Sequence, residues 1–261
     1  MNRILTGIVL ILIGLTVITI GKWPLLVWLW LVSIMITHEV LLMFNVASYL
    51  KRGMIALMTT GFYLAIKVIF PILMTPISFA VIICLFILFC IEIFRRKIFA
   101  KHPFLIMLRA FLIGPVALSY IYILREFPQG LTLTWFCFLS IWSTDIIALY
   151  AGRSFGKTPL SVISPNKTIE GTISGIFGTL IILLVYCYFT QLSFMIYLPI
   201  GFILSCLAQL GDLHESLVKR HCHVKDSGSV LPGHGGFYDR SDSSIFVFPL
   251  VLILFYFIGI L

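Results

Sequence analysis

Charged residues are scarce in this chain of 261 residues: they make up 11% of it, against 61% hydrophobic residues. A soluble domain needs a more polar surface, and the mean hydropathy of +1.12 is typical of an integral membrane protein. The six Cys show no recognisable pairing pattern and most lie in apolar runs, so no disulfide framework is expected. The sequence also lacks an internal repeat and a low-complexity linker. These absences exclude a secreted disulfide scaffold and a repeat protein.

Long apolar runs are what the chain does contain. A helix needs about 20 apolar residues to cross about 30 Å of hydrocarbon. The runs therefore predict an all-α, polytopic membrane protein with about nine transmembrane helices. No small-residue cleavage site follows the first run, which favours a retained span over a removed signal peptide. The predicted spans are 4–20, 23–43, 54–72, 77–94, 104–124, 131–151, 172–190, 194–211 and 244–261.

The basic residues predict how these spans are oriented. Cytoplasmic loops of membrane proteins carry an excess of Lys and Arg. Most of the 18 basic residues fall at the N-terminus and in every second loop. The N-terminus is therefore expected in the cytoplasm and the C-terminus outside. Topology then explains most of the net charge of +8. The remaining positive charge suits an anionic lipid or substrate. Nucleic acid is therefore not an expected partner.

The two halves of the chain differ in their acidic residues. Residues 1–130 hold three of the ten acids and are predicted to be N-terminal scaffold spans. Residues 131–261 hold the other seven, most of them in or beside two predicted cytosolic loops, 152–171 and 212–243. We therefore expect the catalytic region in residues 131–261.

The densest polar block runs from Ser216 to Asp242. A charge at a bilayer centre costs roughly 2.5–3.5 kcal/mol, so this block is expected outside the hydrocarbon. Carboxylates are suitable ligands for Mg²⁺, while cations and Gly-rich backbone suit phosphate oxygens. A solvated loop whose charges merely balance is the alternative. The candidate acids are Asp212, Asp226, Asp239 and Asp242, and the interleaved cations are Lys219, Arg220, Lys225 and Arg240.

The helix of the eighth predicted span is expected to continue past Gly211 into this block. Asp212, Ser216, Lys219 and His223 would then share one helix face, with Glu215 beside them. The Gly-rich segment 232–236 cannot remain helical, and its His234 is a candidate phosphate or nucleotide contact.

Two familiar motifs fit this chain poorly. Zinc is suggested by several His residues and Cys222, but their spacing matches no standard zinc module. Residues 152–158 resemble a Walker phosphate-binding loop, but only three residues separate the glycines and a membrane span precedes them. A generic anion-binding loop completed by residues 164–171 remains open. The His residues concerned are His214, His221, His223 and His234.

Acids inside predicted spans are candidate functional residues because their exposure to lipid is costly. Asp145 is one, and a structural ion pair with Arg109 is the alternative. Glu39 is another, for which structural pairing with His38 is favoured.

Together these residues resemble a known family. The pattern Ser216-x2-Lys219-Arg220-x4-Lys225-Asp226-x-Gly228-x3-Pro232-Gly233-His234-Gly235-Gly236-Phe237-x-Asp239-Arg240-x-Asp242 resembles the signature of the phosphatidate cytidylyltransferase family. Asp145-x2-Ala148-x3-Gly152-Arg153-x-Phe155-Gly156-Lys157 and Ser164-Pro165-x-Lys167-Thr168-x-Glu170-Gly171 are similar to a second stretch of that family. The resemblance covers about residues 140–243, while the N-terminal spans match only in being hydrophobic. Ser241 and Leu149 depart from the family pattern without removing a charge.

The resemblance implies a reaction in which CTP and phosphatidic acid give CDP-diacylglycerol and pyrophosphate, with Mg²⁺ required and a second cation left open. It implies a membrane-lipid substrate, and the lack of a targeting extension favours the bacterial plasma membrane (inner membrane). A homodimer is left open. The implied catalytic residues are Asp212, Asp239, Lys219 and Arg220. The implied primary metal ligands are Asp212 and Asp239, with Asp226 and Asp242 as second metal ligands or as residues that orient the ligands. The implied substrate-binding residues are Asp145, Lys157, Lys167, Ser216, Lys225, His234, Gly235, Gly236 and Arg240.

Two alternatives stay open from the sequence. One is a CTP-using membrane enzyme with another lipid acceptor, such as a polyprenol kinase or an ether-lipid cytidylyltransferase. The other is a transporter with Asp145, Arg109 and Glu39 along an ion path, although the polar residues concentrate in loops and no repeat is present.

Overall fold

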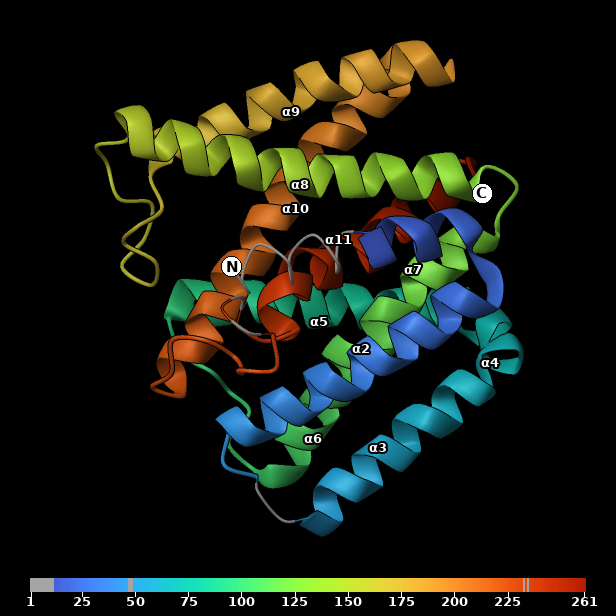
Figure 1. Ribbon diagram of the computed structural model, residues 1–261, viewed down its shortest axis with the longest axis vertical. Coiled ribbons are helices and arrows are strands. Elements are labelled where there is room, and N and C mark those ends of the chain that lie inside the picture. Colours follow the sequence, from blue (N-terminus) through green and yellow to red (C-terminus); the bar gives the residue numbers. More distant parts are fainter. Residues whose placement is uncertain (1–11, 47–48, 232, 234) are drawn as a thin grey trace.

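The computed structural model describes residues 12–46, 49–231, 233 and 235–261. Within these residues the regular structure is helical, with two isolated β-bridges and no strand, which confirms the all-α class (Figure 1). Residues 12–20 are helical. The helices that follow are α2 (Lys22–Met43), α3 (Tyr49–Leu64), α4 (Ile66–Leu73), α5 (Pro76–Arg95), α6 (Pro103–Phe111), η1 (Leu112–Val116), α7 (Ala117–Glu126), α8 (Gly130–Phe155), α9 (Ile169–Thr190), α10 (Phe194–His221) and α11 (Tyr238–Phe257).

Seven helical segments of the described chain are long and apolar enough to cross a membrane, or eight if one bent pair counts as a span. The protein is therefore a multi-pass membrane protein. The predicted number of about nine spans is not confirmed, and the predicted orientation of the termini stays a prediction. The first predicted span, 4–20, lies partly outside the described residues. The seven are α2, α5, the run α6–η1–α7, α8, α9, α10 and α11.

The predicted single span 54–72 is wrong in its shape. Its residues belong to α3 and α4, whose axes differ by 81° across Ala65. At this point Val68 donates its backbone N–H to the carbonyl of Ala65, only three residues back, so the chain starts a new helix in another direction. Hydropathy alone cannot distinguish a straight apolar helix from two bent ones.

The predicted polar loop 212–243 is helical at both ends. As expected, α10 continues past Gly211, but it ends at His221, and α11 already begins at Tyr238. His223 has a left-handed φ of 57°, and the N–H groups of His223 and Val224 bond back to the carbonyls of Arg220 and Lys219. This is the Schellman ending of a helix, so His223 does not share the face of Asp212 as predicted.

Helices α10 and α11 touch backbone to backbone at Gly211. A Cβ on Gly211 would lie 2.7 Å from the carbonyl oxygen of Asp242 and 3.0 Å from the Cα of Ser243. The Ser243 hydroxyl also donates to the carbonyl of Ala208 at 3.0 Å. This close crossing places the acids that follow Gly211 opposite those at the start of α11.

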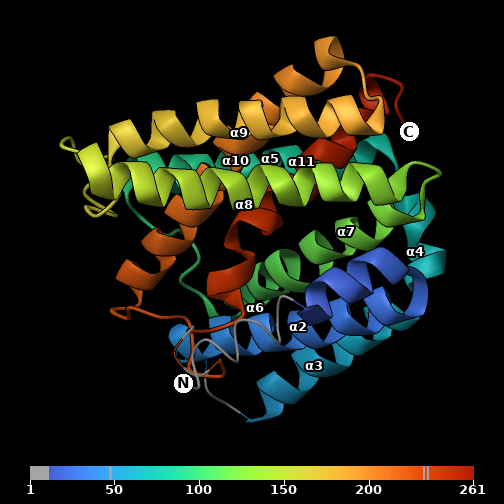
Figure 2. The same ribbon diagram turned by 45° about the horizontal axis from the view of Figure 1, so that its top comes forward.

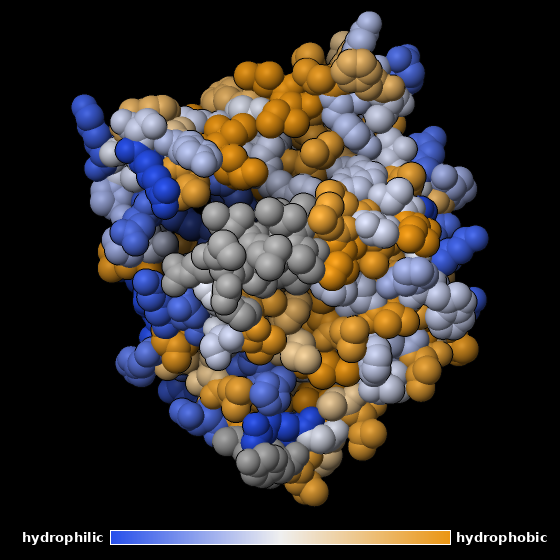
Figure 3. Space-filling view, viewed as in Figure 1, coloured by the Kyte–Doolittle hydropathy of each residue, from blue (hydrophilic) through white to orange (hydrophobic). Residues whose placement is uncertain are grey.

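Helices α8 and α9 lie side by side in both ribbon views (Figures 1 and 2). Gly171, Gly175 and Gly178 of α9 face Ala148, Thr144 and Ile147 of α8 at distances that leave no room for a Cβ. Small residues allow membrane helices to approach closely in this way. Figure 3 shows hydrophobic residues over this helix pair, while hydrophilic ones gather along the left of the same face, near the α8–α9 loop.

Gly211→Ala tests the crossing of α10 and α11. We expect it to cost about 1–3 kcal/mol of stability because the new methyl group forces two backbones apart. Thermal unfolding in detergent measures the effect. The matched control is Gly61→Ala in α3, where a Cβ meets no atom within 4 Å. Equal unfolding temperatures for the two variants would contradict the close crossing.

Candidate active site

Three carboxylates meet where α10 crosses α11. Asp212 and Glu215 are neighbours on one face of α10, and Asp242 faces them from α11. Ligand atoms of the three lie within 4.8 Å of one another. Glu215 is only 1% exposed while Asp212 and Asp242 are half-buried, and carboxylates this close together repel one another without a compensating cation. Their oxygens are the ligands that Mg²⁺ prefers, so these three residues could hold a divalent cation.

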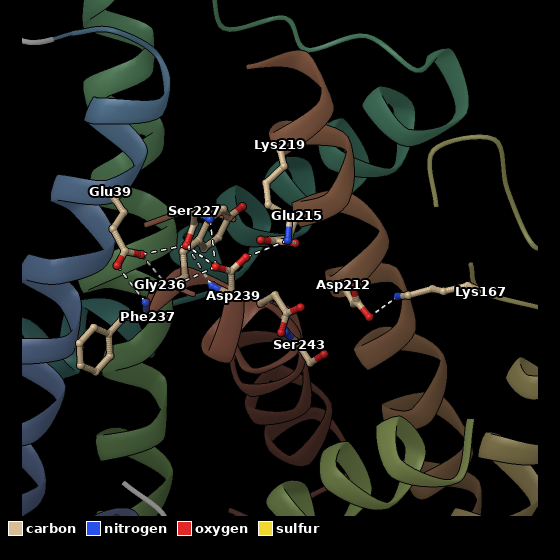
Figure 4. A network of polar contacts seen from close by, with 12 residues as sticks. Glu39, Lys167, Asp212, Glu215, Lys219, Ser227, Gly236, Phe237, Asp239 and Ser243 are labelled. Carbon is tan, nitrogen blue, oxygen red and sulfur yellow. Dashed lines mark hydrogen bonds and ion pairs between the residues drawn. The ribbon is translucent and has the colours of Figure 1, made fainter. Parts of the chain in front are cut away.

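Asp239, predicted to be a primary metal ligand, lies outside this cluster and is occupied by hydrogen-bond donors (Figure 4). Its Oδ2 accepts from the backbone N–H of Ser227 at 2.9 Å and of Gly236 at 2.8 Å, and from the Ser227 hydroxyl at 2.9 Å. Its Oδ1 accepts from Lys219 Nζ at 2.8 Å, and Lys219 also pairs with Glu215 at 2.7 Å. Asp239 therefore orders the 222–237 connection and fixes Lys219 beside the cluster.

The loop between α8 and α9 delivers a second lysine. Lys167 forms an ion pair with Asp212 (Figure 4). The loop is closed on itself, since Leu160 N–H donates to the carbonyl of Lys167 at 2.7 Å and Ile169 N–H to that of Thr158 at 2.9 Å. The Glu170 carboxylate accepts hydrogen bonds from the N–H groups of Lys157 and Thr158. These two amides are therefore hydrogen-bonded to a carboxylate of the protein itself.

A cavity of about 1200 Å³ joins this polar cluster to an apolar interior. Its polar end is lined by acids and cations from α8, α10, α11 and the α8–α9 loop. Its apolar end lies among helix 12–20, α2, α7 and α8. Such a cavity suits a ligand with a charged head and a hydrocarbon body. Residues of the apolar end include Ile18, Leu25, Trp28, Leu118, Phe138 and Trp142.

The structure brings most of the predicted site residues to this cavity. Six described ones are not among its lining: Lys157, Arg220 and Lys225 are exposed elsewhere, Ser216 and Gly236 are buried, and Gly235 is half-buried. His234 lies outside the described residues. The predicted residues that do line it are Asp145, Lys167, Asp212, Lys219, Asp226, Asp239, Arg240 and Asp242.

The glycines of the 222–237 connection approach the protein's own carboxylates. A Cβ on Gly235, whose φ is +79°, would meet Asp239 Oδ2 at 2.5 Å, and one on Gly236 would collide with Ser227 and Glu39. The Gly236 N–H is already donated to Asp239. The sequence suggested a Gly-rich turn for the triphosphate, whereas these contacts explain the glycines by internal packing.

Arg109 does not pair with Asp145, which corrects that alternative. It forms a buried two-point ion pair with Glu92, at 2.7 Å for Nη2–Oε2 and 3.0 Å for Nη1–Oε1. His214 Nε2 completes the group at 2.6 Å from Arg109 Nη2 and 3.1 Å from Glu92 Oε2. His214 therefore faces away from the acid cluster, and the candidate metal cluster of the described residues contains neither His nor Cys.

Sequence reasoning missed two acids of the site region. It placed Glu215 only beside the predicted helix face, although the spacing of three from Asp212 was a usable signal. It favoured His38 as the partner of Glu39, whereas Glu39 contacts Ser227, Phe237 and Tyr238. Nothing local in the sequence links Glu39 to residues almost two hundred positions later.

Comparison with known proteins decides the family. Residues 1–258 match the family described as the cytidylyltransferase family. The chain belongs to the cytidylyltransferase family. The match includes the N-terminal spans, for which the sequence patterns showed only hydrophobicity.

Curated relatives in the cytidylyltransferase family are bacterial. The phosphatidate cytidylyltransferase of Staphylococcus haemolyticus (strain JCSC1435) is 37% identical over 97% of both chains. That of Bacillus subtilis (strain 168) is 35% identical over 97% of this chain and 96% of the relative. That of Staphylococcus aureus (strain COL) is 44% identical over 60% of this chain and 63% of the relative.

The buried Glu92–Arg109 pair gives a stability prediction. Glu92→Met leaves the Arg109 charge buried without its carboxylate and is expected to cost about 3–5 kcal/mol. The double variant Glu92→Met/Arg109→Met removes both charges and is expected to recover part of that loss. Thermal unfolding compares the two, and a double variant no more stable than Glu92→Met would contradict the pairing.

Proposed function

We propose that this protein transfers the cytidylyl group of CTP to phosphatidic acid, giving CDP-diacylglycerol and pyrophosphate in the bacterial plasma membrane. The observation that carries the proposal is that one continuous cavity joins the carboxylate–lysine cluster to an apolar interior. A nucleotide triphosphate suits the polar end and diacylglycerol chains suit the apolar end. The curated names of the bacterial relatives support this choice of substrates.

The metal of this reaction is assigned to the three clustered acids. Asp212, Glu215 and Asp242 are hard oxygen donors on two helices whose crossing holds them together. This donor set fits Mg²⁺. Bound there, Mg²⁺ supplies positive charge that offsets the charge of the triphosphate and of departing pyrophosphate. Asp226 lines the cavity outside the cluster.

The cations of the cavity bind the phosphates. Lys219 is held in place by Asp239 and Glu215, and Lys167 reaches the cluster from the α8–α9 loop. Arg240 lines the same cavity. Positive groups fixed in advance stabilise charge that develops on the equatorial and leaving oxygens of the transition state.

The chemical step itself needs mainly positioning. A phosphate oxygen of phosphatidic acid forms a bond to the α-phosphorus of CTP, and the bond from that phosphorus to the bridging oxygen of the β-phosphate breaks. The leaving group carries its electron pair away as pyrophosphate. The attacking phosphate is already anionic, so no general base is required, and alignment by the cavity adds to the charge stabilisation by the cations. Asp145 lines the same cavity, and we place the lipid phosphate near it.

The transporter alternative is disfavoured by the contacts of its proposed residues. Arg109 is paired with Glu92, and Glu39 accepts hydrogen bonds from the start of α11. Neither residue lines the cavity. The other alternative, a CTP-using enzyme with a different lipid acceptor, is tested by comparing lipid substrates in one assay.

Pyrophosphate release by detergent-purified protein tests the proposal. We expect release with CTP, Mg²⁺ and phosphatidic acid together, and none when ATP replaces CTP or a dolichol-type lipid replaces phosphatidic acid. Glu215→Gln is expected to lower turnover by about 10²–10³-fold because the charged cluster is broken. The matched control is Glu126→Gln, at an exposed acid outside the cavity, which should retain turnover. Wild-type turnover in Glu215→Gln would contradict the assignment.

A further inference from the structure

The N-terminus of α11 lacks a cap from its own sequence. Its N-cap residue, Phe237, makes no side-chain hydrogen bond and has helical φ and ψ of −69° and −31°. The first N–H groups of any helix have no partner within that helix, and leaving them buried without one is costly. Asp239 and Asp242 lie in the first two turns of α11, so the order of this helix start determines where both carboxylates sit.

Glu39 of α2 supplies the missing acceptor (Figure 4). Its Oε1 accepts from Phe237 N–H and its Oε2 from Tyr238 N–H, both at 2.9 Å. Glu39 is 1% exposed, so solvent does not screen its charge against the positive end of the helix dipole. Gly228 and Gly236 leave room for it, since a Cβ on Gly228 would lie 2.9 Å from Glu39 Oε1.

Ser227 links this cap to the site. Its hydroxyl lies 3.0 Å from Glu39 Oε2 and 2.9 Å from Asp239 Oδ2. Asp239 in turn holds Lys219, and Lys219 holds Glu215 of the acid cluster. A continuous series of polar contacts therefore runs from α2 to the candidate metal site.

We propose that Glu39 is a positioning residue of the active site: it caps α11 from another helix and thereby fixes Asp239 and Asp242 relative to Asp212 and Glu215. Glu39 is not among the residues that line the cavity, so it acts through α11 and Ser227 and not on substrate. The consequence for metal binding rests on the proposed function, whereas the cap itself does not.

Glu39→Gln is the decisive variant because it keeps the size of the side chain. One of its two acceptor oxygens becomes an NH₂ group, which faces an N–H or hydroxyl donor. The matched control is Thr75→Ala, which removes the side-chain cap of α5, where Thr75 accepts from Ser78 N–H at 3.3 Å. Thr75 is outside the cavity lining.

Two measurements on the full-length protein in detergent separate positioning from general destabilisation. In Glu39→Gln, hydrogen exchange of residues 236–243 should accelerate about tenfold, the scale expected for a lost helix cap with charged acceptors. Mn²⁺ affinity, followed by electron paramagnetic resonance without substrate, should weaken by about tenfold for the same reason. Thr75→Ala should accelerate exchange only at the start of α5 and leave Mn²⁺ affinity unchanged.

Each outcome decides the proposal. Wild-type exchange at residues 236–243 in Glu39→Gln would overturn the cap, and faster exchange with unchanged Mn²⁺ affinity would overturn the positioning role. A wild-type protein that binds no Mn²⁺ would instead refute the metal site of the proposed function. Hydrogen exchange of residues 236–243 would still test whether Glu39 caps α11. If Glu39→Gln does not fold, Ser227→Ala replaces it. We then expect smaller changes in hydrogen exchange and Mn²⁺ affinity, in the same direction. Wild-type values of both would overturn the role of Ser227 as the link between Glu39 and Asp239.

Discussion

Burial of carboxylates in a chain with few charges is the constraint on which the rest of this structure depends. Asp212, Glu215 and Asp242 are brought together at a helix crossing that only a glycine at 211 permits. Around them Lys167 and Lys219 supply opposite charge. Lys167 pairs with Asp212 and Lys219 with Glu215, as the cost of burying charge demands. The arrangement both stabilises the acids and leaves them ready for a cation and a triphosphate.

The N-terminal half contributes more than a hydrophobic wall. Glu39 reaches the start of α11, and the Glu92–Arg109 pair holds His214, the residue next to Glu215. These buried polar contacts join α2, α5 and α6 to the helices that carry the acid cluster. The family match likewise extends over residues 1–258 and not only over the polar block.

The sequence was sufficient to predict the helical membrane class, the second-half location of the acid cluster and the family. Hydropathy and a dense polar block carry these conclusions because both are local properties of the chain. The bend at Ala65 and the partners of Glu39 and Arg109 depend on contacts between distant segments, which no local pattern encodes. The chemistry of its carboxylate and the family resemblance predicted Asp239 as a metal ligand, and its hydrogen bonds to Lys219, Ser227 and Gly236 depend on segments that no local pattern brings together.

Cytidylyl transfer as proposed requires that α10 and α11 together form a divalent-cation site. Anomalous diffraction from crystals of the protein with Mn²⁺ and CTP tests it most directly. We expect a Mn²⁺ peak bounded by the carboxylates of Asp212, Glu215 and Asp242, with the triphosphate beside Lys219. A Mn²⁺ peak away from these three acids, with CTP bound, would contradict it.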